Sequence, residues 1–125
     1  MGKNVMVNGK VYACTISLAM DIVGGKWKTV ILHHLKNGEK RYNVLRKEIP
    51  AITEMTLSLQ LKQLEESGLV SRVVHGDKPP VKVVYNLTDF GRTFLPALEA
   101  IDQWGNFVAE RIGEPVTADT EPAVI

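Results

Sequence analysis

The stretch TEMTLSLQLKQLEESG, which begins at Thr53 and ends at Gly68, constrains the fold more than any other part of the chain. Leu57, Leu61 and Leu64 recur at i, i+4 and i+7, the spacing that places three side chains on one stripe of an α-helix. Thr53 suits the N-cap position, and Gly68 suits the left-handed residue that commonly ends a helix. We therefore predict an amphipathic helix that packs its leucine stripe against a core.

The segments on either side of this helix predict a second helix before it and a β-hairpin after it. Before it, residues Tyr42 to Glu48 are typical of a short helix that Pro50 ends. After it, LVSRVV and VKVVYNL flank HGDKPP, which predicts two strands joined by a turn. Helix, turn, helix and hairpin in this order are typical of a winged helix-turn-helix. The expected fold class is therefore α+β and mostly α.

Length and composition are those of one globular domain, because 125 residues with 45% hydrophobic and 23% charged side chains can bury a core. No apolar run approaches the roughly 20 residues of a membrane span. The N-terminal sequence MGKNVMVNGK lacks the apolar region of a signal peptide, so we expect a cytoplasmic protein that does not bind membranes. The single cysteine, Cys14, excludes a disulfide within one chain.

The net charge of +1 hides a division of charge along the chain. Residues 26–92 contain twelve Lys or Arg and seven Asp or Glu, whereas residues 93–125 contain one Arg and six Asp or Glu. Mixed charge on solvated faces explains the total but not this segregation. The predicted helix-turn-helix is thus the basic part, as DNA binding requires, and the acidic end is expected to face away from phosphate.

The segments before the helix-turn-helix are less clearly patterned. Residues 1–13 alternate too briefly to decide between a strand and an arm, and we expect an arm with a turn at Asn8-Gly9. The next stretch predicts a helix that starts near Cys14, is capped by Thr15 or Ser17, and stops at Gly24-Gly25. A second helix follows in KWKTVILHHLKNG, and an extended piece at residues 39–41 is expected to pair with the wing.

The C-terminal part predicts a helix with more apolar surface than one small domain needs. Thr88 caps a helical region in which Pro96 should force a kink or a restart. Because monomers seldom expose large apolar patches, we expect this helix to form a homodimer interface. The residues predicted to lie in that interface are Leu98, Ile101, Trp104 and Val108. We expect the domain to span residues 14–112 and residues 113–125 to form a disordered tail.

Five ordered motifs resemble the HxlR-type winged helix-turn-helix regulators of bacteria, which are similar in architecture to the MarR group. They are CTISLAMDIVGGKWK, RYNVLRKEIP, LSLQLKQLEESGLVSR, VYNLTDFGR and LEAIDQWG. The resemblance implies a cytoplasmic homodimer that binds operator DNA. It places residues 54–67 in the major groove, the hairpin beside them, and the first and last helices in the dimer contact. The sequence departs from many members at Glu54, Met55, Thr56 and Leu59, which makes the preferred operator unpredictable.

Two sets of residues are predicted to contact double-stranded DNA. Leu59 and the Thr56 methyl group suit thymine methyl groups, Gln60 suits adenine, and Lys62 suits a phosphate. The whole predicted recognition set is Met55, Thr56, Ser58, Leu59, Gln60 and Lys62. The predicted backbone and wing contacts, which give salt-dependent affinity, are Lys40, Arg41, Arg46, Lys47, Arg72, His75, Lys78 and Lys82.

Some HxlR-type regulators sense oxidants or electrophiles through a cysteine that matches Cys14. A thiol near a helix N-terminus tends to have a lowered pKa, and its thiolate is the reactive form. The alternative is a small packing residue, which is how most single cysteines behave. Because the chain has no second cysteine, a sensor here requires a Cys14 to Cys14 bridge between chains, a mixed disulfide with a low-molecular-weight thiol, or an electrophile adduct.

No residue constellation suggests an enzyme. His33 and His34 are adjacent on a predicted helix and diverge by about 100°, so they do not form a metal pair. The sequence Gly24-Gly25-Lys26 lacks the spacing of a phosphate-binding loop. We expect no metal and no cofactor. The alternative function is a winged helix that contacts another protein without binding an operator, since this fold is not itself a function.

Overall fold

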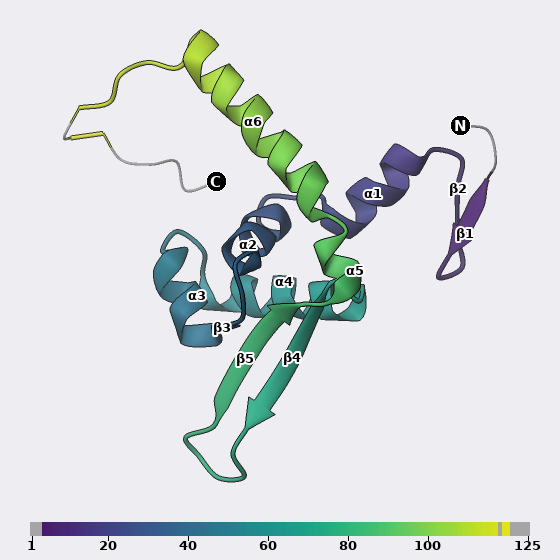
Figure 1. The fold of residues 1–125 in the computed structure, drawn as a ribbon, viewed down its shortest axis with the longest axis vertical. Helices are drawn as coiled ribbons and strands as arrows, with labels where there is room; N and C mark the ends of the chain where they lie inside the picture. The colour runs from purple at the N-terminus through teal and green to yellow at the C-terminus, as the bar shows by residue number, and fades with distance from the viewer. Residues whose placement is uncertain (1–3, 118, 121–125) are drawn as a thin grey trace.

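The computed structural model describes residues 4–117 and 119–120, and Figure 1 shows their arrangement. The elements in chain order are β1 (Val5–Val7), β2 (Lys10–Tyr12), α1 (Thr15–Val23), α2 (Lys28–Leu35), β3 (Lys40–Arg41), α3 (Tyr42–Glu48), α4 (Glu54–Glu66), β4 (Val70–His75), β5 (Lys82–Leu87), α5 (Asp89–Arg92) and α6 (Leu95–Ile112). The order α3, α4, β4, β5 is the predicted winged helix-turn-helix, which the structure confirms.

Helix α4 has the predicted ends and the predicted buried stripe. Its first turn is capped by Thr53, whose Oγ1 accepts a hydrogen bond of 3.1 Å from the backbone N–H of Thr56. Gly68 follows the helix with a φ of +83°, a conformation that glycine adopts without strain. The stripe of Leu57, Leu61 and Leu64 is fully buried. Helix α4 is therefore fixed along its length against the core.

The wing is an antiparallel hairpin in a three-stranded sheet with the order β3, β5, β4. Strands β4 and β5 pair from Val70 opposite Leu87 to His75 opposite Lys82. Strand β3 pairs with β5 through Lys40 opposite Tyr85, so the pairing predicted for residues 39–41 is confirmed. The base of the hairpin is buried, whereas its tip extends away from the helices (Figure 1).

The core lies between α2, α3, α4 and the base of the sheet. Ile31 and Leu35 of α2 and Leu45 of α3 are fully buried there beside the leucine stripe of α4. Trp27, from the turn before α2, packs on the edge of this core. The helix-turn-helix and the wing therefore share one hydrophobic core.

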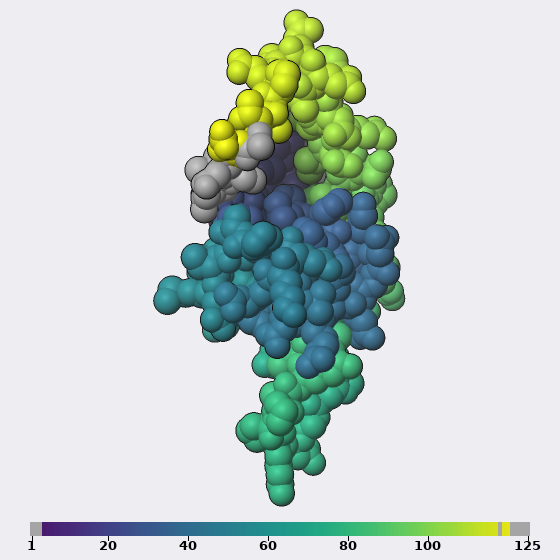
Figure 2. Space-filling view, turned by 90° about the vertical axis from the view of Figure 1, so that its left-hand side faces the viewer, coloured from purple at the N-terminus to yellow at the C-terminus, as the bar shows by residue number. Residues whose placement is uncertain are grey.

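Helix α6 leaves this core after a break. The short helix α5 is capped by Thr88, whose Oγ1 accepts a hydrogen bond of 2.9 Å from the N–H of Gly91. The chain restarts as α6 with Pro96 in its first turn, as predicted. Leu98 is the one buried residue of α6. In Figures 1 and 2 the rest of α6 projects beyond the core, so most of its surface is open in the single chain.

The N-terminal region differs from the expectation in two ways. The described part of the expected arm is a hairpin of β1 and β2, which turns at Asn8 (φ +49°) and Gly9 (φ +80°). The prediction that Thr15 or Ser17 caps α1 is wrong, because Cys14 occupies the N-cap position and its side chain makes no capping hydrogen bond. The chain enters α1 one residue earlier than its hydroxyl residues suggested.

Residues 113–117 form neither helix nor strand. The predicted disordered tail otherwise falls partly outside the described residues, at 118 and 121–125, and so do residues 1–3 of the expected arm. Within the described part of the chain, every helix is too short or too polar to cross a membrane.

Candidate DNA-binding surface and thiol site

The face of α4 opposite the leucine stripe carries three exposed side chains at i, i+4 and i+7. Met55 is 83% exposed and Leu59 is 50% exposed, and Lys62 is exposed beyond them. Thr56 and Gln60 are half-buried and flank this row. The structure therefore gathers all six predicted recognition residues on or beside one outer face.

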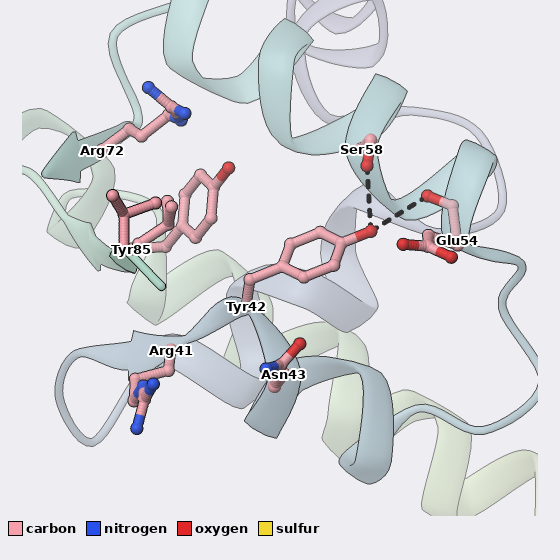
Figure 3. Close-up of a pocket in the computed structure, with 9 residues that line it drawn as sticks. Arg41, Tyr42, Asn43, Glu54, Ser58, Arg72 and Tyr85 are labelled. Carbon is pink, nitrogen blue, oxygen red and sulfur yellow. Dashed lines mark hydrogen bonds between the residues drawn. The ribbon is translucent and has the colours of Figure 1, made fainter. Parts of the chain in front are cut away.

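Ser58, the sixth, is exposed at the edge of this face, beside Tyr42. Its Oγ lies 2.9 Å from the hydroxyl of Tyr42, which also donates a hydrogen bond of 3.2 Å to the backbone carbonyl of Glu54 (Figure 3). The hydroxyl of Thr56 is engaged as well, since Thr53 Oγ1 donates to Thr56 Oγ1 at 2.8 Å. The hydroxyl groups of α4 are thus bound within the protein, and its outer face is left to Met55, Leu59 and Lys62.

A cavity of about 400 Å³ separates the start of α4 from the wing. Its walls come from α3, α4 and the paired strands, and Figure 3 shows the rings of Tyr42 and Tyr85 inside it, with Arg41 and Arg72 on opposite sides. The cavity is lined by Arg41, Tyr42, Asn43, Glu54, Ser58, Arg72, Val81, Val83 and Tyr85.

The basic residues of β3 and α3 divide into two groups. Arg41 and Lys47 are exposed and make no ion pair with a described residue, and Arg46 forms a long pair of 3.6 Å with Glu54. Lys40 is different, because its ammonium nitrogen lies 2.6 Å from both carboxylate oxygens of Glu48. Lys40 is therefore engaged in an ion pair with Glu48, whereas Arg41, Arg46 and Lys47 face solvent.

The predicted wing residues are all exposed. Arg72 and His75 lie on β4, Lys82 begins β5, and Lys78 lies in the loop between the strands. The hairpin that carries these four residues projects from the core in Figure 1. The wing thus presents exposed positive charge.

Cys14 occupies the N-cap position of α1 and is half-buried. The backbone N–H groups of Ser17 and Ile16 lie near its sulfur and lower the pKa of the thiol, although neither makes a capping hydrogen bond to it. Such N–H groups stabilise the thiolate because the first turn of a helix leaves its donors without partners in the helix. The site therefore favours the nucleophilic form of the cysteine.

The predicted dimer residues do not all lie on the open surface of the single chain. Ile101 is 49% exposed and Trp104 is 68% exposed, while Val108 is half-buried. Leu98 is only 7% exposed, so it contributes to the interior of its own chain. Helix α1 adds exposed Ile16 and Met20 near the same end of the molecule. Phe107 and Ile112 of α6 are also exposed.

The structure adds functional candidates that the sequence pattern did not indicate. Tyr42 and Glu48 were expected only as the ends of the short helix α3, yet Tyr42 bonds to α4 and Glu48 bonds to Lys40. A tyrosine at the start of a helix gives a weak signal, because its hydroxyl needs a polar partner when its ring is partly buried. Among the described residues, no group of three or more His, Cys, Asp or Glu side chains is placed to bind a metal.

Comparisons with known proteins agree with this architecture. The pattern of the HxlR-like helix-turn-helix family matches residues 22–112. The uncharacterized HTH-type transcriptional regulator YdeP of Bacillus subtilis is 46% identical over 99 residues, which cover 79% of this chain and 77% of YdeP.

Two solved structures are similar over most of the chain. The redox regulator HypR in its reduced form is 39% identical with a TM-score of 0.73, over 78% of this chain and 95% of HypR. Diamide-treated YodB from B. subtilis is 34% identical with a TM-score of 0.58, over 83% of this chain and 98% of YodB. This chain therefore belongs to the HxlR-like helix-turn-helix family and is a transcriptional regulator of the helix-turn-helix type.

Proposed function

We propose that the protein is a homodimeric, sequence-specific DNA-binding regulator of the cytoplasm, and that Cys14 couples its DNA affinity to oxidants or electrophiles. The observation that carries the DNA-binding part is the outer face of α4. Met55, Leu59 and Lys62 stand opposite a fully buried leucine stripe, so the helix can enter a major groove without exposing the core.

The charges around α4 support the same role. Arg41 and Lys47, which precede α4 in the chain, and Lys78 on the wing, which follows it, are exposed cations. In a winged helix-turn-helix the support helix and the wing lie against the phosphate backbone on either side of the recognition helix. Cations there supply affinity that does not depend on base sequence, while the α4 side chains supply the preference for bases.

The apolar surface of α6 supports a dimer. Ile101 and Trp104 are one helical turn apart and both exposed, and Ile16 and Met20 of α1 add to the apolar surface at this end. A second copy of the chain would remove these side chains from water by two-fold symmetry. Two recognition helices then bind two half-sites, so the operator is expected to be an inverted repeat.

The thiol part of the proposal rests on the surroundings of Cys14 and on the relatives. The helix N-terminus favours its thiolate, and HypR is described as a redox regulator. Helix α1 carries both the thiol and part of the apolar surface proposed for the dimer. A bridge or adduct at Cys14 would thereby change the distance between the two recognition helices. In the first reaction, two Cys14 thiols form a disulfide while diamide takes up their two protons and two electrons. In the second, the Cys14 thiolate adds to a quinone and forms an adduct.

An equilibrium competition experiment tests DNA binding. Duplexes enriched from a random pool should bind the reduced protein about 10³-fold or more tightly than a scrambled duplex at the same salt concentration. A protein that acts only as a protein-interaction module would enrich no sequence. Equal affinity for the enriched and the scrambled duplex would contradict the proposal.

A further inference from the structure

We propose that Tyr42 is a positioning residue that sets which face of α4 is turned toward DNA, through its hydroxyl contacts with Glu54 and Ser58. This inference rests on the proposed function, because it concerns how α4 reads bases. Tyr42 itself does not lie on the outer face of α4, since it is the first residue of α3.

The contacts of Tyr42 join two helices at two points. Its hydroxyl donates to the Glu54 carbonyl at 3.2 Å and lies 2.9 Å from Ser58 Oγ, which can donate in return. Glu54 and Ser58 are four residues apart, so they lie one above the other on the same side of α4. Figure 3 shows the Tyr42 hydroxyl between them. Two contacts on one stripe restrain the rotation of the first turns of α4 about the helix axis.

The restraint acts at the start of α4 and adds to the hold of the buried leucine stripe. Burial of that stripe fixes α4 on the core, but the hydrophobic effect itself has no preferred direction. A hydrogen bond is directional and weakens steeply away from linear geometry. The Tyr42 contacts therefore select one rotation, in which Ser58 faces the cavity and Met55 and Leu59 face outward. Ser58 becomes part of the restraint and does not read bases.

Tyr85 provides a matched control in the same cavity. Its ring lines that cavity beside Tyr42, and the residue is 7% exposed. Its hydroxyl makes no hydrogen bond to any residue that the structure describes. Replacing either tyrosine with phenylalanine keeps the ring and removes one hydroxyl. The two variants therefore differ in the hydrogen bonds to α4.

The experiment measures base discrimination for the full-length wild type, Tyr42→Phe and Tyr85→Phe. Each protein is titrated with the selected operator and with variants that carry one base change in a half-site. Tyr42→Phe should reduce this discrimination about threefold to tenfold, the effect of about one hydrogen bond. Tyr85→Phe should keep it. Affinity for a scrambled duplex, which reports phosphate contacts, should be equal in all three proteins.

A double-mutant cycle separates positioning from general stability. If Tyr42 acts through Ser58, then Tyr42→Phe should cause a smaller further decrease of discrimination in a Ser58→Ala background than in the wild type. Unchanged discrimination in Tyr42→Phe, or fully additive decreases, would overturn this inference and leave the proposed function in place. A wild-type protein that prefers no sequence would overturn both.

Discussion

Lys40 and Glu48 form a two-point ion pair in which the Lys40 ammonium nitrogen lies 2.6 Å from each carboxylate oxygen of Glu48. His34 Nδ1 lies 2.9 Å from Glu48 Oε1, so the same carboxylate joins α2, β3 and α3. These contacts, with Lys40 first and His34 second, lower the pKa of Glu48. A lysine that the sequence suggested for DNA thereby stabilises the scaffold that holds α4.

The lowered pKa of Glu48 predicts a pH dependence of stability. A carboxyl group whose pKa is lower in the folded chain stabilises the fold fully above its unfolded pKa, about 4.3 for Glu, and loses this contribution as the pH falls through the folded value. Glu48→Gln should therefore reduce stability by about 0.2 to 1 kcal/mol at pH 7. This loss should shrink as the pH falls below the unfolded pKa and should disappear below the lower, folded pKa.

Urea unfolding at several pH values measures this difference. Glu39→Gln is the control, because Glu39 is exposed and makes no ion pair with a described residue. An equal decrease of stability for Glu48→Gln at neutral and acidic pH would contradict the claim that the ionised Glu48 carboxylate stabilises the fold.

The two groups of lysines predict different salt dependences of DNA binding. Lys47→Ala and Lys78→Ala should each weaken binding to all sequences and reduce the slope of log affinity against log salt by about 0.9 for each phosphate that the variant no longer neutralises. Lys40→Ala should leave that slope nearly unchanged, because its charge is already paired with Glu48. Binding titrations from low to moderate salt give the slopes. A slope that falls equally for Lys40 and Lys47 would show that the ion pair opens on DNA.

The dimer proposal predicts a change in mass. Ile101→Glu combined with Trp104→Glu places two carboxylates in the proposed interface, where they would be desolvated without partners, so the protein should become monomeric. Gln103→Glu adds a carboxylate on another side of α6 and should remain dimeric. Sedimentation equilibrium decides between the two states. Dimers of unchanged stability in the double variant would place the interface elsewhere.

The thiol proposal predicts that an oxidant changes operator affinity. Treatment of the wild type with diamide should change affinity by about 5- to 150-fold, which is the usual range for coupled sites. Cys14→Ser should bind like the reduced wild type and ignore the reagent. Because the pKa of Cys14 is lowered, its alkylation at neutral pH should also be faster than that of a free cysteine. Modified Cys14 in mass spectra with unchanged affinity would make the thiol a bystander.

Much of the scaffold could be predicted from local sequence signals. The stripe of Leu57, Leu61 and Leu64, the cap at Thr53 and the left-handed Gly68 all lie within one short segment, and each follows a local rule. The pairing of residues 40 and 41 with the wing was also correct. These features depend on backbone preferences that the residues carry themselves.

The side-chain contacts of the site could not be predicted in the same way. Tyr42 meets Ser58 across 16 residues, and the side chains of Lys40 and Glu48 meet only because β3 and α3 are folded together. At Cys14 the sequence misplaced the cap, because Thr15 and Ser17 have stronger capping preferences than the cysteine that holds the position. The polarity of a side chain predicted whether it is exposed, but not which neighbouring residue it bonds to.

The most direct test of operator reading by α4 compares the base sequences selected from a random duplex pool by the wild type and by Leu59→Gln. Leu59 is 50% exposed on the outer face of α4 and is not part of the buried leucine stripe, so the variant should fold. We expect an inverted repeat for the wild type, and for Leu59→Gln a change at one symmetric base position in each half-site that costs about 1 to 3 kcal/mol when mismatched. The same selected sequence for both proteins, or no selected sequence for either, would contradict the claim that this face of α4 reads the operator.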